Sequence, residues 1–209
     1  EDDDVRRRGR DYFRRVSDSI EDETFASDQE PLNPRNPIPC RPGRRAHGPA
    51  MISLGGVAMM LDTDEGDFWA ERGAATIDRI LRRHVSRGRY PELETWDFIE
   101  FVDAEGRPWE ENGKVLCDPG HGLEFVGLAS KFLLTAERLG MRDGPVAEIR
   151  GRCRDALPEL LVHLFDCGFH SESEGIYKTI DLKSRRPVNS ELPWWSLPET
   201  IRASTLIQS

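Results

Sequence analysis

The chain has 209 residues, of which 37% are hydrophobic and 32% charged, so it has enough apolar residues for the core of one globular domain. Its formal net charge of −9 argues against a general binder of nucleic acid or of anionic membranes. The four cysteines are scattered, no apolar run approaches the ~20 residues that cross a bilayer, and no signal peptide is evident. We therefore expect a cytoplasmic protein with reduced thiols.

The first half of the chain predicts three helices. Apolar residues recur at helical spacing over about residues 3–21, 49–62 and 68–87. Between the first two, the segment 21–48 is rich in Pro, Asn, Asp and Arg and predicts a long loop. The second helix contains two adjacent glycines, which are costly inside a helix, so we expect close backbone packing or a pocket wall at that point.

The second half mixes extended segments with further helices. Extended structure is expected over 93–102 and near 176–180, and a turn over 103–106 makes the first of these part of a short hairpin. Helices are predicted over 119–139, over 144–166 and from Pro193 onward. The helix over 119–139 is apolar on more than one side, which is typical of an inner helix. The pattern predicts an all-α protein with short hairpins at one end.

The most informative stretch is Asp-Pro-Gly-His-Gly-Leu-Glu at residues 118–124. Asp118 suits a helix N-cap and Pro119 suits the first helical position. His121 and Glu124 are three residues apart, so they lie on one face of the predicted helix. An imidazole with a carboxylate in reach can take a proton from carbon and return it near neutral pH. The same pattern also fits a structural histidine at a helix start, so both interpretations stay open on these residues alone.

This stretch resembles the Asn-Pro-Gly-His-x-x-Glu signature of the N-acylglucosamine 2-epimerase family, which includes cellobiose 2-epimerases and aldose–ketose isomerases. Other blocks follow in the family's order. Residues 48–54 are similar to its Pro-Met-Met helix, and Leu93-Glu94 is similar to the opening of its hairpin. Residues 165–177 are similar to its Gly-Trp-Asp…Gly-Gly-Leu turn, and 193–199 to its Trp-Trp-x-x-x-Glu helix. The resemblance spans nearly the whole chain.

The resemblance implies an (α/α)6 barrel with a sugar pocket at one end. Members of the family are considerably longer, so residues 1–209 correspond to the middle portion of a single barrel domain. The late helix that carries a second catalytic histidine in the family has no counterpart. Because half a barrel leaves an apolar face open, we expect either a truncated chain or one that a second copy or a partner chain closes.

The resemblance also implies roles for particular residues. His121 would move the proton at C2 of an open-chain sugar, while Glu124 would orient the imidazole or bind a hydroxyl. Trp194 or Trp195 would stack on the sugar, and the carboxylates of Glu94 and Glu199 would bind its hydroxyls. The predicted function is that of a carbohydrate epimerase or isomerase acting on a small sugar, with no cofactor, nucleic acid or membrane partner.

Two alternative functions stay open. A sugar-binding or regulatory module would keep the pocket without turnover. An (α/α)6 glycoside hydrolase would need facing carboxylates, such as Glu94 and Asp97.

Other histidines and cysteines carry weaker signals. His47, beside a predicted helix start, is a weak ligand candidate, whereas His84 and His163 suit structural or surface positions. A zinc site is predicted to be absent because its four possible ligands lack a standard spacing: Cys117, His121, Cys167 and His170.

Overall fold

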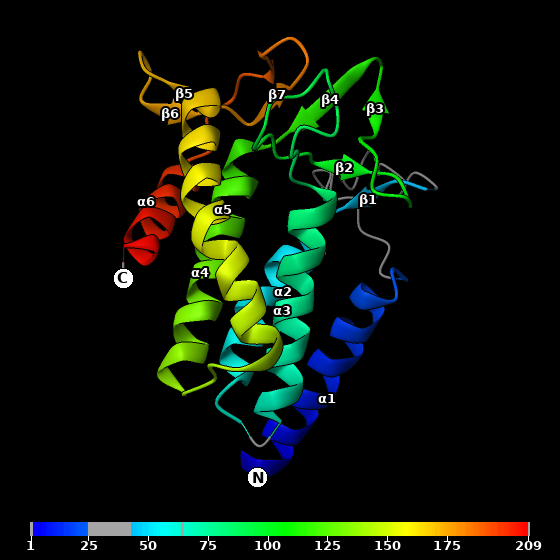
Figure 1. Cartoon of the computed structure of the whole chain (residues 1–209), viewed down its shortest axis with the longest axis vertical. Coiled ribbons are helices and arrows are strands. Elements are labelled where there is room, and N and C mark those ends of the chain that lie inside the picture. Colours follow the sequence, from blue (N-terminus) through cyan, green and yellow to red (C-terminus); the bar gives the residue numbers. More distant parts are fainter. Residues whose placement is uncertain (1, 25–42, 64, 209) are drawn as a thin grey trace.

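The computed structural model describes residues 2–24, 43–63 and 65–208 of the chain. This described part is mainly helical, as predicted (Figure 1). Its helices are α1 (Asp2–Glu21), α2 (Gly48–Met60), α3 (Gly66–Arg83), α4 (Pro119–Arg138), α5 (Gly144–Gly168) and α6 (Ser196–Ile207). Its strands are β1 (Arg45–Ala46), β2 (Phe101–Val102), β3 (Glu110–Glu111), β4 (Lys114–Cys117), β5 (Phe169–His170), β6 (Gly175–Ile176), β7 (Thr179–Asp181) and β8 (Arg186–Asn189).

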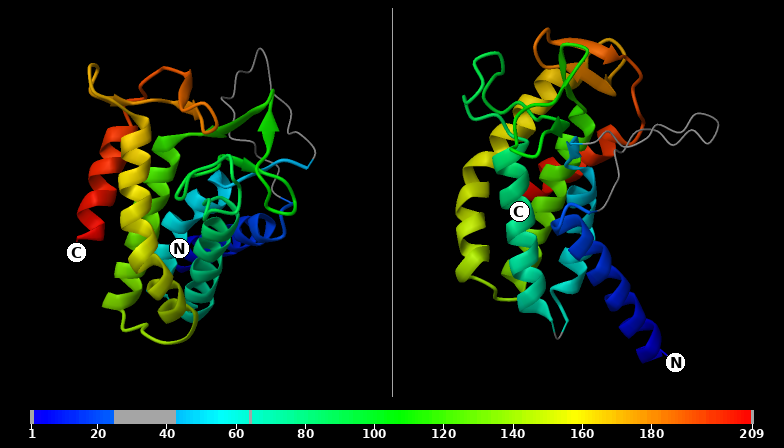
Figure 2. Two further views of the ribbon diagram at one scale, coloured as in Figure 1. Left: turned by 45° about the horizontal axis from the view of Figure 1, so that its top comes forward. Right: turned by 90° about the vertical axis from the view of Figure 1, so that its right-hand side faces the viewer.

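Helix α4 lies at the centre of the helical layer. It packs against α2, α5 and α6, while α3 packs against α2 and α5 (Figures 1 and 2). Its residues are buried on several sides, including Leu123, Phe125, Val126 and Phe132. This confirms the inner helix that its apolar pattern predicts. The N-terminal end of α4 is thereby fixed between several neighbouring helices.

The strands lie together at one end of the helices (Figure 1). The largest sheet is antiparallel with the order β3-β4-β7-β8, and β1-β2 and β5-β6 form two small pairs. Strands β3 and β4 are joined by Asn112 and Gly113, whose φ angles are 52° and 78°. A two-residue loop with both φ angles positive has the type I′ geometry that matches the twist of a hairpin. Strand β4 runs directly into the Asp-Pro-Gly-His turn, so the sheet and α4 share one junction.

The expected strand over 93–102 is wrong over most of its length, because only Phe101–Val102 form strand β2. The preceding residues turn instead. Trp96 has a φ of 77°, and the Asp97 carboxylate accepts a hydrogen bond of 2.8 Å from the backbone N–H of Glu94. The β-branched and aromatic composition favours a strand, but this buried carboxylate holds a turn.

Two other sequence predictions need adjustment, whereas the first helix is present as predicted. The single strand expected near 176–180 is two strands, β6 and β7, and the sixth helix begins at Ser196 rather than Pro193. Helix α1 is present, but only part of its apolar face is covered: Phe13 stacks on Trp69 at 5.0 Å, whereas Tyr12 is exposed. The loop predicted over 21–48 lies largely outside the described residues.

One of the two adjacent glycines of α2, Gly56, serves close packing. A Cβ on Gly56 would lie 2.5 Å from the ring of Phe13, so only glycine lets α1 approach here. None of the helices in the described part of the chain combines the length and apolarity needed to cross a membrane.

Candidate active site

The turn that begins α4 has the local geometry predicted for it. Asp118 is the N-cap, and its Oδ1 accepts a hydrogen bond of 3.2 Å from the backbone N–H of His121. Pro119 occupies the first helical position. A Cβ on Gly120 would lie 2.9 Å from the ring of Trp195, so glycine allows the start of α6 to pack against this turn. The imidazole of His121 is thus held at a rigid helix start.

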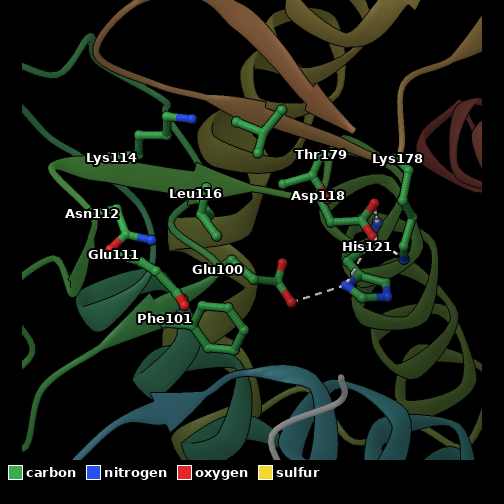
Figure 3. A pocket seen from close by; sticks show the side chains of 11 residues that line it. Glu100, Phe101, Glu111, Asn112, Lys114, Leu116, Asp118, His121, Lys178 and Thr179 are labelled. Carbon is green, nitrogen blue, oxygen red and sulfur yellow. Dashed lines mark hydrogen bonds and ion pairs between the residues drawn. The ribbon is translucent and has the colours of Figure 1, made fainter. Parts of the chain in front are cut away.

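His121 faces a buried carboxylate that sequence reasoning did not single out. Its Nδ1 lies 3.1 Å from Oε1 of Glu100, the residue just before β2, and 3.4 Å from Oδ2 of Asp118 (Figure 3). The second oxygen of Glu100 lies 3.1 Å from Nε2 of His47. Because a carboxylate can only accept, each imidazole donates an N–H hydrogen bond to Glu100. The carboxylate therefore fixes which nitrogen of each imidazole carries a proton.

These contacts shift the pKa values of both partners. Burial by itself would raise the pKa of Glu100, but attraction by His121 and His47 outweighs it and holds the pKa well below the usual value. Burial likewise disfavours a charged His121, yet the Glu100 carboxylate outweighs it and raises the pKa of His121 to about 9. At pH 7 about one imidazole in a hundred is therefore neutral. In that neutral form Nδ1–H still points at Glu100, and the free electron pair is on Nε2.

A cavity of about 340 Å³ opens beside this pair. Figure 3 shows its lining side chains: Glu100, Phe101, Glu111, Asn112, Lys114, Leu116, Asp118, His121, Lys178, Thr179 and Val188. Lys178 donates a hydrogen bond of 2.5 Å to Oδ2 of Asp118. A ligand of this cavity would thus meet an imidazole, a carboxylate and an ammonium group together.

Trp195 adds an aromatic surface to this site. Its ring stacks on that of His121 with centroids 5.5 Å apart, and the Nζ of Lys178 lies 5.3 Å from its centroid. Trp195 contacts the cavity-lining residues His121 and Lys178 without lining the cavity itself, whereas its neighbour Trp194 is 83% exposed and contacts neither ring nor cavity lining in this way. Of the two tryptophans that the sequence proposes as sugar-stacking residues, Trp195 is therefore the one that contacts His121.

The predicted carboxylates occupy different positions. Glu124 is half-buried on α4, and within the described residues it makes no hydrogen bond or ion pair with His121. Burial and the charge of Glu199 raise its pKa. Glu199 pairs with Arg202 on α6. Glu94 is exposed, lies 3.5 Å from Arg185 and does not line the cavity.

Glu100 and Lys178 are the main residues that sequence reasoning missed. A signal for Glu100 is present, because it is a lone acidic residue within the apolar run Phe98-Ile99-Glu100-Phe101-Val102. A charge in such a run needs a buried partner. Lys178 carries no comparable signal, since it lies in a mixed segment between two short strands. His47, a weak ligand candidate by sequence, is fully buried against Glu100.

A second buried carboxylate, Asp97, lies in a different environment. Its Oδ1 accepts hydrogen bonds from His163 at 2.8 Å and Arg185 at 2.6 Å. Its Oδ2 accepts from Arg185 at 2.7 Å and from the backbone of Glu94 at 2.8 Å. All of its accepting positions are occupied, so Asp97 is unsuited to act on a glycosidic bond together with Glu94.

Two groups in the described part of the chain have the spacing of a metal site. The ligand atoms of His47, Glu100 and His121 lie within 4.8 Å of one another, as do those of Glu94, Asp97 and His163. The guanidinium of Arg185 opposes a cation in the second group. In the first group, each oxygen of Glu100 already accepts a hydrogen bond from an imidazole N–H.

Neither group contains a cysteine. Cys117, Cys153 and Cys167 are free thiols, as predicted, and burial raises the pKa of Cys167 to about 12. Cys40 lies outside the described residues. The described residues therefore do not assemble the zinc set of Cys117, His121, Cys167 and His170.

Comparison with known proteins identifies the family. The family model described as N-acylglucosamine 2-epimerase (GlcNAc 2-epimerase) matches residues 3–209. None of the curated proteins compared with the chain matches it. The matched family implies epimerase or isomerase activity on sugars in general. The chain belongs to the N-acylglucosamine 2-epimerase family.

Proposed function

We propose that the protein is a carbohydrate epimerase or aldose–ketose isomerase in which His121 exchanges the proton at C2 of an open-chain sugar. One observation carries the proposal: Glu100 holds Nδ1–H of an imidazole that lines a cavity beside Asp118 and Lys178. This arrangement leaves Nε2 as the atom that gains and loses a proton. In this scheme Glu100 is a positioning residue, because it acts through His121.

The reaction begins with the neutral form of His121. Its Nε2 takes the proton from C2, and the electrons of the C–H bond form a C1–C2 double bond as the carbonyl oxygen becomes negative. The resulting imidazolium is stabilised by Glu100, since the pKa of His121 is about 9. Return of this proton to C1, with transfer of the O2 proton to O1, gives the ketose. Epimerisation requires protonation at the opposite face of C2, by a second acid that the proposal leaves unassigned.

Lys178 supplies the positive charge that the intermediate needs. Its ammonium is 2.5 Å from Asp118 and lies over the ring of Trp195, next to His121. A fixed cation near a developing oxyanion lowers the barrier because no solvent has to reorganise. Trp195 offers a flat apolar surface for the carbon-bound hydrogens of a sugar. Glu124 and Glu199 remain proposed hydroxyl ligands from α4 and α6.

The proposal includes the finer fold assignment, an (α/α)6 toroid. It is supported by packing in which α4 lies between α2 and α6, while α3 packs against α5. A second copy or a partner chain would close the remaining helices of such a toroid. The site would then lie at the end where the strands gather (Figure 1).

A sugar-binding module without turnover is the second candidate. The observation that favours it is the pKa of His121, which leaves the imidazole mainly protonated and therefore a donor at pH 7. Such a group would hold a sugar hydroxyl or carbonyl oxygen by a charge-assisted hydrogen bond.

One experiment separates these two functions. The full chain is incubated in D2O with glucose, mannose, N-acetylglucosamine or N-acetylmannosamine, and proton NMR follows both the C2 hydrogen and new sugar signals. Deuterium at C2, together with an epimer or a ketose, is the expected result. Calorimetric binding of a sugar without any exchange between pH 7 and 9 would instead establish the module.

A further inference from the structure

The cavity has a second end, away from His121. Strand β4 and the residue after it place Lys114, Leu116 and Asp118 on one face, because alternate residues of a strand point the same way. Val115 and Cys117 point to the core from the other face. Four residues at about 3.3 Å each separate Lys114 from Asp118 by roughly 13 Å. Figure 3 shows Lys114 and His121 at opposite ends of this row.

Among the described residues, Lys114 is the exception in a cavity whose other charged side chains are paired. Glu100 is bonded to His121, and Asp118 is bonded to Lys178. Glu111 lies 3.1 Å from Arg44, whose side chain is fully buried. Each acidic group of the lining therefore has its own cation. By contrast, within the described part of the chain the ammonium of Lys114 has no ion pair or hydrogen bond.

The surroundings of Lys114 suit an anion. The amide of Asn112, on the hairpin turn beside it, lines the same end of the cavity and can donate two hydrogen bonds. Phe101, Leu116 and Val188 give the cavity apolar walls. Lys114 and Asn112 are themselves exposed, so an anion can reach both from solvent. The repulsion of an anion by Glu111 is offset by its buried partner, Arg44.

We propose that the cavity takes a sugar with an anionic group, a phosphate or a carboxylate, at the end remote from the reacting carbonyl. The ammonium of Lys114 and the amide of Asn112 bind the anion, while C1 and C2 lie at His121. This inference rests on the proposed function for the orientation of the sugar, and the anion site itself has an independent test.

The test measures binding rather than turnover. Sorbitol and sorbitol 6-phosphate are titrated calorimetrically into the full chain; both are open-chain and lack the carbonyl that reacts. A charge-assisted contact with an exposed ammonium predicts that the phosphate ester binds about threefold to tenfold more tightly. K114A should remove the difference between the two ligands, and K114R should keep most of it. K131A, which truncates an exposed lysine on α4, is the matched control and should keep the full difference.

Further arms identify the anion. A six-carbon polyol acid with its carboxylate at C6 distinguishes a carboxylate from a phosphate, and a preference for either supports the inference. Equal binding of sorbitol and both anions would overturn it, as would a preference that survives K114A. Inorganic phosphate that binds as tightly as the ester would also overturn it, because the sugar would then contribute nothing.

The two proposals fail in different ways. Preference for the anionic polyol without deuterium exchange on any sugar would remove the proposed function and leave the anion site. Exchange on neutral sugars without that preference would leave the function and remove the anion site.

Discussion

Glu100 and Asp97 are buried carboxylates only three residues apart in the chain, yet their partners differ in kind. Asp97 is held by the guanidinium of Arg185, which keeps its charge at every accessible pH, and by His163. Within the described residues the side chain of Glu100 bonds only imidazoles, those of His47 and His121. Burial is common to both carboxylates. They differ in that His121, the partner of Glu100, can release a proton into the cavity, whereas Arg185, the partner of Asp97, only holds the structure.

The largest effect that tests this comparison is expected from removing each imidazole in turn. H121A should lower deuterium exchange at C2 by about a thousandfold or more, because general base catalysis contributes that order of rate. H163A, the matched histidine of the Asp97 cluster, should change exchange by less than about tenfold. Proton NMR of a sugar in D2O measures the exchange, and circular dichroism checks folding. Equal losses in both variants would erase the distinction between the two clusters.

Substitutions of the two carboxylates should affect different properties: stability for Asp97 and exchange for Glu100. D97N is expected to lower the free energy of unfolding by about 2–3 kcal/mol, because it leaves Arg185 without its charge partner. This is less than the full cost of breaking a buried ion pair, since the side chain of Arg185 is 30% exposed. E100Q should reduce exchange at pH 10, where His121 is mainly neutral in both proteins, by about tenfold to a hundredfold, because the amide no longer stabilises the imidazolium. Urea unfolding and the D2O assay measure the two effects. Greater loss of exchange in D97N than in E100Q would contradict the assignment.

The pH dependence should differ between catalysis and stability. Below pH 9 the exchange rate should rise about tenfold per pH unit, since the neutral fraction of His121 rises with it. Stability should change in the opposite direction. The pKa of about 9 in the folded state lies above the ordinary histidine value of 6.5, so the contribution of His121 is complete below pH 6.5 and lost as the pH rises through 9.

Acid should act through a different histidine. Burial lowers the pKa of His84 to about 3, so the unfolded chain binds a proton below pH 6.5 that the folded chain does not. Stability is then lost as the pH falls from 6.5 towards 3. Thermal melts between pH 4 and 10 test the predicted losses of stability in acid and in base, and exchange rates over the same range test the role of His121. An exchange rate that is flat between pH 7 and 9 would argue against His121 as the base.

The helical framework could be read from the chain because its signals are local. The apolar periodicity predicts the six helices, and Asp118 and Pro119 predict the start of α4 to the residue. The turn over 91–97 could not be read in this way. It depends on Asp97, whose partner Arg185 is 88 residues away along the chain. Tertiary pairing overrides the local preference for a strand.

The sequence by itself determined that a histidine stands at the start of an inner helix, within a chain that resembles a sugar epimerase. Capping and periodicity are short-range effects, so they are legible without the fold. Only the tertiary structure decided which carboxylate that histidine meets. Glu124 is close in sequence, whereas Glu100 is 21 residues away and His47 a further 53 from Glu100. The proximity of these groups is set by how β2 and the start of α2 pack against α4, and that packing shifts the pKa of His121 to about 9.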